Sequence, residues 1–401
     1  MKTCALILSL LFFIGDLYSV GNLYVQSPIA KLMDQPQANS NGESLNVGES
    51  VSPVSEQGLF MQVRRGQKTG WVNKLFLSAF PPGGQIKLNS QAEVSDSVQA
   101  RQRASDFTKT AAARGLTETE SLRVRGQGHT YDFDSLVWLE TNSSDSGKNI
   151  AKSPEVGTIF EKTESVGNIP KSTEQEIKVG RSIAAKLIYK YGLKKDKEAI
   201  VLLNSLGRSL SKNTSRTDLP FLFGILETDE INAFACPGGI ILLTKGLIKS
   251  IQDTSELAGV LSHEISHVVL KHSGEFDSMN PFLEFLFGLL SPAGGQVVNS
   301  ATSLAVEQME KQFMETGRDQ KTEYEADGAG AMLSAISGYS STKYEQYLER
   351  ISKSSDSKTQ SKTHPDYKSR ISEIQKYSAS STKSDNKNPE FNLERLKKEL
   401  P

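Results

Sequence analysis

The stretch Glu256–Ser273 reads ELAGVLSHEISHVVLKHS and contains an H-E-x-x-H box at His263, Glu264 and His267. Two histidines four residues apart on a helix lie about 40° apart in projection, so both imidazoles can reach one zinc ion. Glu264 follows the first histidine, where it can take a proton from a zinc-bound water. The stretch therefore predicts a zinc-binding helix with Glu264 as its general base.

This helix has its own start and stop signals. Asp253 and Glu256 form a D-x-x-E start, and Gly274 follows the last apolar turns. The residues between them are apolar almost all round, which is typical of a buried helix. On a helical wheel His272 falls on the side opposite His263. We therefore expect His272 to have a structural or supporting role rather than to be a ligand.

A zinc site of the thermolysin type needs a third protein ligand. The stretch 319–338, DQKTEYEADGAGAMLSAISG, predicts a second helix. Glu323 and Asp327 share one face of it with Ala326 and Gly330, small residues that let this helix approach the zinc helix closely. Glu325 points about 160° away from Glu323, so Glu323 is the preferred ligand candidate. Without the H-E-x-x-H box, the stretch would be interpreted as an exposed acidic helix.

Composition and length indicate the class of protein. The chain has 401 residues and a formal net charge of -1, so no general field draws it to nucleic acid or anionic lipid. Residues 1–21 combine Lys2, a short apolar run and small residues near the end, which predicts a secretory signal peptide. No other stretch reaches about 18 uninterrupted apolar residues, so we expect no transmembrane span in the mature chain. We expect an exported protein, periplasmic or secreted.

The chain divides into several segments. Residues 22–80 alternate short strands with turns, and LNVGESV followed by TGWVNKLFL resembles bacterial SH3-like domains. We expect this barrel to act as a folding and spacing module or to bind peptides, cell wall or envelope proteins. Residues 81–168 are interpreted as a linker with a helical and irregular middle region, and residues 379–401 as a polar tail. Residues 169–378 are the predicted catalytic domain.

The catalytic domain is predicted to be α+β, mostly helical with a small sheet. Two β-rich runs, Phe221–Leu226 and Ile240–Leu243, come before the zinc helix. Near its end, THPDYKSR places His364 and Arg370 where they can return to the metal as donors to an oxyanion. A His-Pro turn that caps a helix explains the same residues equally well.

Five spaced motifs resemble one family in order. They are EQEIKVG, INAFACPGGIILLTKGLI, ELAGVLSHEISHVVLKH, EYEAD and THPDYKSR. The region from about Ser172 to Ser372 resembles the soluble, BepA-like branch of the metallopeptidases that also include HtpX and the CAAX prenyl proteases. The resemblance implies a gluzincin-type domain with one zinc ion per chain. One departure is that Asp319-Gln320 stand where members often have a Ser-Arg pair.

The resemblance also implies residue roles. His263, His267 and Glu323 correspond to the zinc ligands, Glu264 to the general base, and Asp327 to a carboxylate that orients a ligating histidine. His364 and Arg370 match the family's H-P-x-x-x-x-R element near the metal, whose histidine can also hold the enzyme latent. The edge strand against which a peptide substrate lies corresponds to Asn232, Ala233, Phe234 and Ala235.

Together these patterns predict an exported zinc-dependent endopeptidase that hydrolyses unfolded or misassembled envelope proteins. One alternative is a latent or chaperone-like zinc protein whose site is closed by His364. Another is a cell-wall-binding module in which the barrel carries the main function.

Overall fold

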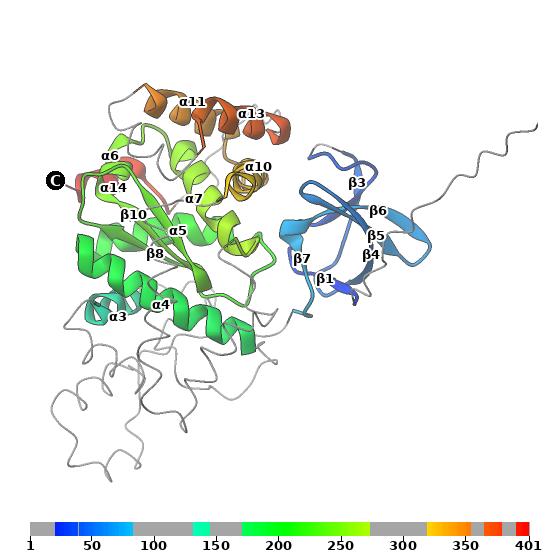
Figure 1. The fold of residues 1–401 in the computed structure, drawn as a ribbon, viewed down its shortest axis with the longest axis horizontal. Coiled ribbons are helices and arrows are strands. Elements are labelled where there is room, and N and C mark those ends of the chain that lie inside the picture. The colour runs from blue at the N-terminus through cyan, green and yellow to red at the C-terminus, as the bar shows by residue number, and fades with distance from the viewer. Residues whose placement is uncertain are drawn as a thin grey trace, which may run out of the picture.

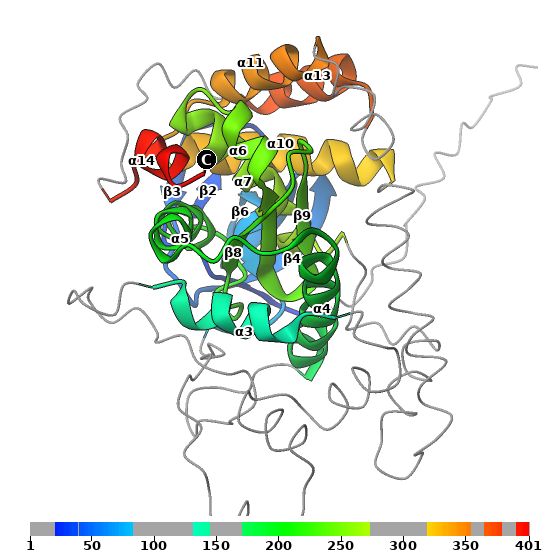
Figure 2. The ribbon, with the colours of Figure 1, turned by 90° about the vertical axis from the view of Figure 1, so that its left-hand side faces the viewer.

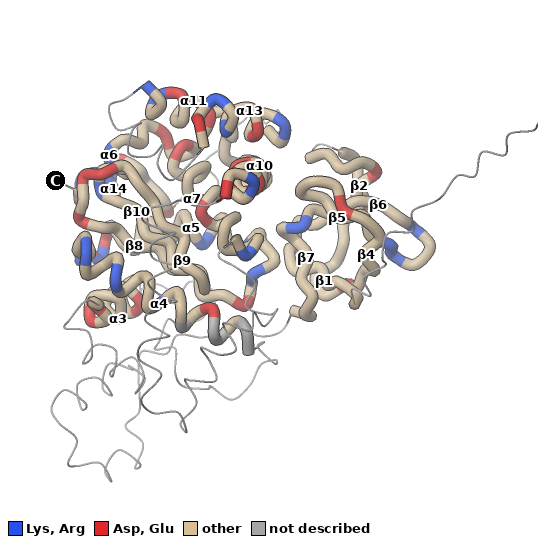
Figure 3. The backbone as a smooth tube through the Cα atoms, viewed as in Figure 1, with Lys and Arg blue, Asp and Glu red and all other residues tan. Residues whose placement is uncertain are grey.

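We describe a computed structural model of the chain, shown in Figure 1. The structure describes residues 21–38, 40–82, 131–144, 171–272, 319–353, 365–378 and 390–400. They form an N-terminal all-β domain and a mostly helical C-terminal domain with a small sheet. Acidic and basic residues are interspersed over both domains (Figure 3). None of the described helices is both long and apolar enough to cross a membrane.

The N-terminal domain is one antiparallel sheet of seven strands, in the order β3-β2-β6-β5-β4-β1-β7. Its core contains small branched side chains that are almost fully buried, among them Val25, Val63 and Val72. The strands are β1 (Leu23–Val25), β2 (Lys31–Met33), β3 (Gly42–Ser44), β4 (Ser50–Gln57), β5 (Phe60–Arg65), β6 (Lys68–Asn73) and β7 (Leu77–Ser78). This all-β domain agrees with the predicted strand pattern, and its assignment as SH3-like stays a prediction.

The C-terminal domain surrounds a three-stranded sheet in the order β8-β10-β9, parallel between β8 and β10 and antiparallel between β10 and β9. Figure 2 places α3 and α4 below this sheet and α10, α11 and α13 above it. The sheet strands are β8 (Leu222–Leu226), β9 (Ala233–Cys236) and β10 (Ile240–Thr244). The helices are α3 (Phe133–Asn142), α4 (Lys171–Tyr191), α5 (Lys197–Ser211), α6 (Lys245–Ser250), α7 (Thr254–Val269), α10 (Gln320–Ile336), α11 (Ser341–Ser352), α13 (Tyr367–Tyr377) and α14 (Leu393–Lys398).

Two helices outside residues 169–378 pack against that segment. Within 81–168, expected to be a linker with a helical and irregular middle region, α3 packs on α4, and a buried ion pair of 2.9 Å joins Arg181 to Glu140. Within 379–401, expected to be a polar tail, α14 packs on α5. Apolar residues hidden among its charges explain this docking, namely Phe391, Leu393, Leu396 and Leu400, which are all buried. Both helices therefore belong to the C-terminal domain. Residues 83–130 and 145–168 of the middle segment lie outside the described residues.

The turn after β9 is fixed by α4. The Glu176 carboxylate, buried on α4, accepts a 3.1 Å hydrogen bond from the backbone N–H of Gly238 and also pairs with Arg216. A Cβ added at Gly180 would lie 1.7 Å from the carbonyl oxygen of Pro237, so only glycine allows α4 to lie this close. The EQEIKVG motif thus has a physical function, which is to seat the turn that connects β9 to β10.

The N-terminal domain packs against α10 and the segment after α5. The Asn73 side chain donates to the sulfur of Met332 on α10 at 3.2 Å. Behind it, the backbone N–H of Ser215 donates to the carbonyl of Leu75 at 2.6 Å. A side-chain hydrogen bond of 3.3 Å also joins Thr217 to Gln26. The all-β domain therefore contacts the helix that carries Glu323.

Helices α7 and α10 lie in backbone contact. A Cβ added at Gly330 would lie 2.8 Å from the backbone nitrogen of His263, well inside ordinary contact. Glycine at this position is what allows the two helices to approach, as the small-residue face of α10 predicted. The approach brings the first turn of α10 beside the third turn of α7, which bears His263.

We expect Gly330→Ala to lower the free energy of unfolding by about 1–3 kcal/mol because the new methyl group overpacks the backbone of α7. This loss would occur although alanine normally favours a helix by about 1 kcal/mol relative to glycine. Ser334→Ala on the same helix is the control. The Ser334 hydroxyl is buried and has no hydrogen-bond partner among the described residues, so its removal should be neutral or slightly stabilising. Urea unfolding of both variants makes the comparison, and a Gly330→Ala variant as stable as wild type would contradict the close approach.

Candidate functional site

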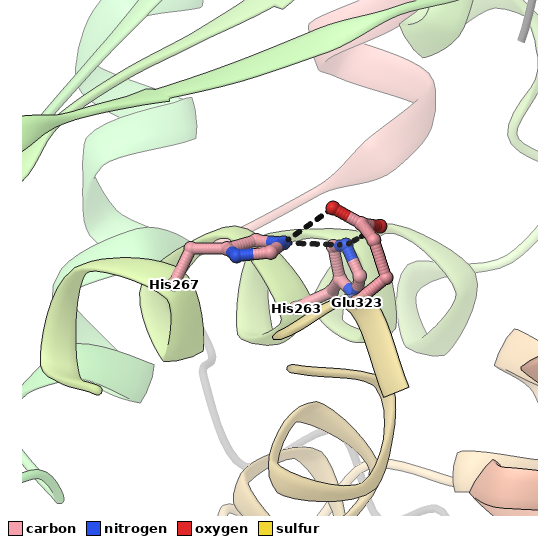
Figure 4. Close-up of side chains that lie close together, drawn as sticks. All are labelled: His263, His267 and Glu323. Atoms are coloured by element: carbon pink, nitrogen blue, oxygen red, sulfur yellow. Dashed lines mark hydrogen bonds and ion pairs between the residues drawn. The ribbon is translucent and has the colours of Figure 1, made fainter. Parts of the chain in front are cut away.

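The two histidines of the H-E-x-x-H box lie on one face of α7. Asp253 is the N-cap of this helix, and its side chain accepts a 2.7 Å hydrogen bond from the N–H of Ser255. One turn apart on the same helix, His263 and His267 are 2% and 1% exposed. Their Nε2 atoms lie 3.1 Å apart (Figure 4). The helix therefore aims two imidazoles at one point inside the protein.

Glu323 reaches the same point from the first turns of α10. One carboxylate oxygen lies 3.3 Å from Nε2 of His267 and the other 3.6 Å from Nε2 of His263 (Figure 4). The ligand atoms of the three residues all lie within 4.8 Å of one another. Neighbouring ligands of a tetrahedral zinc ion with bonds of about 2.0–2.1 Å lie about 3.3 Å apart, so these separations fit such an ion. The group can hold one metal ion.

Glu264 follows His263 directly on α7 and has a buried carboxylate. The residue is 4% exposed, and its Oε2 atom has no hydrogen-bond partner among the described residues. A buried polar atom without a partner is uncommon in native proteins, and a catalytic role is one explanation for it. Its position one residue after His263 places this carboxylate on the same turn as a candidate ligand.

Asp327 supports His263 from behind. Its Oδ1 atom lies 2.9 Å from Nδ1 of His263, on the ring edge opposite the candidate metal position. Burial by itself lowers the pKa of His263, but the charge of Asp327 outweighs it and raises that pKa to about 9. A metal ion at Nε2 must displace the second ring proton, so ion binding and protonation of His263 compete.

Arg370 was expected to return to the metal site as a donor to an oxyanion, and that role stays a prediction. Its Nε and Nη2 atoms donate to the two oxygens of Asp327 at 2.9 and 2.8 Å. A further 3.1 Å hydrogen bond links Nη2 to the hydroxyl of Tyr344. Burial by itself raises the pKa of Asp327, yet Arg370 and His263 outweigh it and lower that pKa below its usual value. Arg370 therefore fixes the position of the Asp327 carboxylate, which in turn contacts His263. Helix α13 contributes to the site through this contact.

His272 and Glu325 contact the site in a way that the sequence did not indicate. The Nδ1 atoms of His267 and His272 lie 2.9 Å apart, and Nε2 of His272 lies 3.3 Å from Oε2 of Glu325. The wheel argument continued α7 through His272, but the helix ends at Val269. Lys271 then adopts a left-handed backbone conformation with φ of 56°, which folds His272 back toward His267. Gly274, the expected stop, lies outside the described residues.

The predicted substrate strand is β9, which lies at the edge of the small sheet and packs against α7. Asn232 comes just before β9, and its backbone carbonyl accepts a 3.0 Å hydrogen bond from Thr244. Ala233 is half-buried, whereas Phe234 and Ala235 are buried. His364 lies outside the described residues, so its expected roles as oxyanion donor or latch stay predictions.

The profile of the family described as Peptidase family M48 matches residues 196–378, which include both candidate ligand helices. Residues 196–378 are a peptidase family M48 domain. The predicted resemblance is thereby confirmed for the C-terminal domain. Members of this metallopeptidase family depend on a metal ion, and the His263, His267 and Glu323 group could hold one.

Named relatives agree with this family. The chain is 29% identical over 208 residues to the beta-barrel assembly-enhancing protease of Escherichia coli (strain K12), which is 49% of this chain and 40% of that protein. It is 31% identical over 159 residues to the protein of the same name from Yersinia pestis, covering 37% and 32% of the two chains. To the mitochondrial metalloendopeptidase OMA1 of Homo sapiens it is 28% identical over 125 residues, covering 30% and 24%. The chain thus spans less than half the length of these relatives.

We expect Arg370→Met to lower the free energy of unfolding by about 3–5 kcal/mol because it leaves Asp327 buried without its cation. Lys376→Met is the control on the same helix, since Lys376 forms an exposed ion pair with Glu373. Losing that pair should cost less than about 1 kcal/mol. Chemical denaturation followed by circular dichroism measures both. Equal losses in the two variants would contradict a buried supporting role for Arg370.

Proposed function

We propose that this chain is an exported zinc-dependent endopeptidase with His263, His267 and Glu323 as its zinc ligands. The observation that carries the proposal is the convergence of these three buried side chains, with the buried carboxylate of Glu264 on the same turn of α7 as His263. Two nitrogen ligands and one carboxylate leave a fourth tetrahedral position for water or substrate, as a catalytic rather than a structural zinc site requires. The site thus combines a metal ligand set with a candidate proton acceptor.

We propose Glu264 as the general base. His263, His267 and Glu323 would hold a zinc ion, which would supply Lewis acidity toward the scissile carbonyl and toward a water. Glu264 would take a proton from the attacking water and return it to the leaving amine. Asp327 accepts the Nδ1 proton of His263, which keeps Nε2 directed toward the ion. Arg370 keeps Asp327 ionised and in place.

We propose that the peptide substrate lies along β9 as an added strand. β9 lies next to the zinc helix, at the edge of the part of the sheet that the structure describes, and strand pairing with an extended chain is independent of side-chain sequence. Asn232, Ala233, Phe234 and Ala235 are the residues proposed to carry it. Such recognition suits unfolded polypeptides, whose backbone groups are accessible. The bacterial relatives are named beta-barrel assembly-enhancing proteases, so we propose unfolded or misassembled envelope proteins as substrates.

The remaining segments are assigned by proposal as well. Residues 1–21 are proposed to be a signal peptide that directs export, on the basis of their apolar run and small residues. The all-β domain of residues 22–80 is proposed to be SH3-like. Its contacts with α10 favour the folding and spacing role over an independent cell-wall-binding role.

We expect Glu264→Gln to reduce hydrolysis of casein by about 10²–10⁴-fold while the bound zinc is retained, because only the proton acceptor is lost. Glu323→Ala should instead lose zinc along with activity. Ser262→Ala is the control next to the box, and it should remain active because its buried hydroxyl has no partner among the described residues. Fluorescent casein hydrolysis and metal analysis of the purified full chain give both readouts.

Two outcomes would contradict this proposal. If Glu264→Gln cleaves casein like wild type with zinc bound, Glu264 is not the general base. If wild type holds zinc but cleaves nothing, the latent or chaperone-like interpretation replaces the peptidase.

A further inference from the structure

We propose that His272 and Glu325 are positioning residues that orient His267 toward the metal, as Asp327 and Arg370 orient His263. The proposal rests on the metal site proposed above. It extends that site from one supported ligand to two, through residues that lie outside the H-E-x-x-H box and outside the face of α10 that carries Glu323.

The direction of the hydrogen bonds follows from metal binding. When His267 binds an ion through Nε2, its ring is neutral and carries its proton on Nδ1. That Nδ1–H lies 2.9 Å from Nδ1 of His272, which must then be the unprotonated nitrogen of a neutral ring. His272 consequently carries its proton on Nε2, which lies 3.3 Å from the Glu325 carboxylate. The donor and acceptor between the two histidines are therefore consistent with metal binding, and the Glu325 carboxylate lies at ion-pair distance from the Nε2–H of His272.

The backbone after α7 is shaped to make this contact. The N–H of His272 donates to the carbonyl of His267 at 2.9 Å, and that of Lys271 donates to Val268 at 3.1 Å. These two bonds form a Schellman motif, in which the residue before the last donor is left-handed and usually glycine. Here that residue is Lys271, with φ of 56°. A left-handed backbone is uncommon for a residue other than glycine, and such residues often occur at functional sites. Here the turn at Lys271 brings the His272 ring into contact with the ring of His267.

The two supports differ in their surroundings. The Asp327 and Arg370 side chains are at most 4% exposed, so that support is enclosed. In the pair that supports His267, the His272 side chain is 4% exposed, but the Glu325 side chain is 39% exposed. Glu325 also lines a pocket of about 350 Å³ between α10, α13 and the turn at Gly58 and Leu59 of the all-β domain. Replacing Glu325 should therefore leave the fold intact, which makes its effect on the metal measurable.

A purely structural interpretation makes a different prediction. If His272 only ends α7, its contribution comes from its backbone N–H, which every substitution except proline keeps. Its ring would then be irrelevant to the metal, and changes at Glu325 would affect nothing beyond the surface. The two interpretations are separated by the affinity for zinc, which needs no active enzyme.

The test is the zinc affinity of the full chain, measured by competition with a chromophoric chelator. We expect His272→Ala to weaken zinc binding about 10–100-fold, the range found when partners of metal ligands are removed. His272→Asn should recover part of this loss, because its Oδ1 atom is as many bonds from Cβ as Nδ1 of histidine and can accept the same proton. Glu325→Gln should weaken binding in the wild-type background and change nothing in the His272→Ala background.

Glu373→Gln is the matched control, since Glu373 lines the same pocket from α13 without contacting the histidines. It should bind zinc like wild type. The inference is overturned if His272→Ala or Glu325→Gln binds zinc as tightly as wild type, or if His272→Asn is as weak as His272→Ala. Should His272→Ala not fold, His272→Asn and Glu325→Gln decide the question. A wild-type chain that binds no zinc would instead refute the proposed function itself.

Discussion

The backbone contact between α7 and α10 determines whether a site exists at all. These helices are separated by the long segment 273–318, yet Gly330 brings them close enough that a single methyl group would lie 2.8 Å from the nitrogen of His263. At a larger helix separation Glu323 could not approach both imidazoles within 3.3–3.6 Å. Other parts of the fold serve the same geometry: α13 contributes through Arg370, and the all-β domain packs on α10 through Asn73.

Around this contact the polar groups are arranged in layers. Taking charges out of water is costly unless each one is paired and hydrogen-bonded. Asp327 pairs with both His263 and Arg370. Arg370 also donates a hydrogen bond to Tyr344. Glu264 departs from this arrangement, because one of its oxygens is buried without a partner among the described residues. A structural site would satisfy this carboxylate, whereas a catalytic one keeps it available to take a proton.

Much of the candidate metal site could be predicted from local sequence patterns. The box on α7 and the face shared by Glu323 and Asp327 follow from the helical repeat, which holds within regular helices. A structural or supporting role was expected for His272, but its contact with His267 was beyond that reasoning, because the helix ends before it and Lys271 reverses the direction of the chain. Glu325 was set aside as pointing away from Glu323, but it meets His272 because of this same turn. Regular spacing cannot predict a left-handed residue that is not glycine.

Contacts between segments far apart in the sequence could not be predicted, for a related reason. Within 379–401 four apolar residues are scattered among charges, so the docking of α14 on α5 depends on a surface that the local sequence does not specify. The motif predicted Arg370 near the site, but its pairing with Asp327 depends on how α10 and α13 pack together. For both α14 and Arg370, the sequence indicated the type of residue but not the residues that it contacts in the fold.

Anomalous diffraction at the zinc edge from crystals of the full chain tests the central claim most directly. The account predicts one zinc peak between α7 and α10, bound by Nε2 of His263, Nε2 of His267 and the Glu323 carboxylate at about 2.0–2.2 Å. A peak coordinated without Glu323, or with Glu325 or His272 in its place, would contradict it.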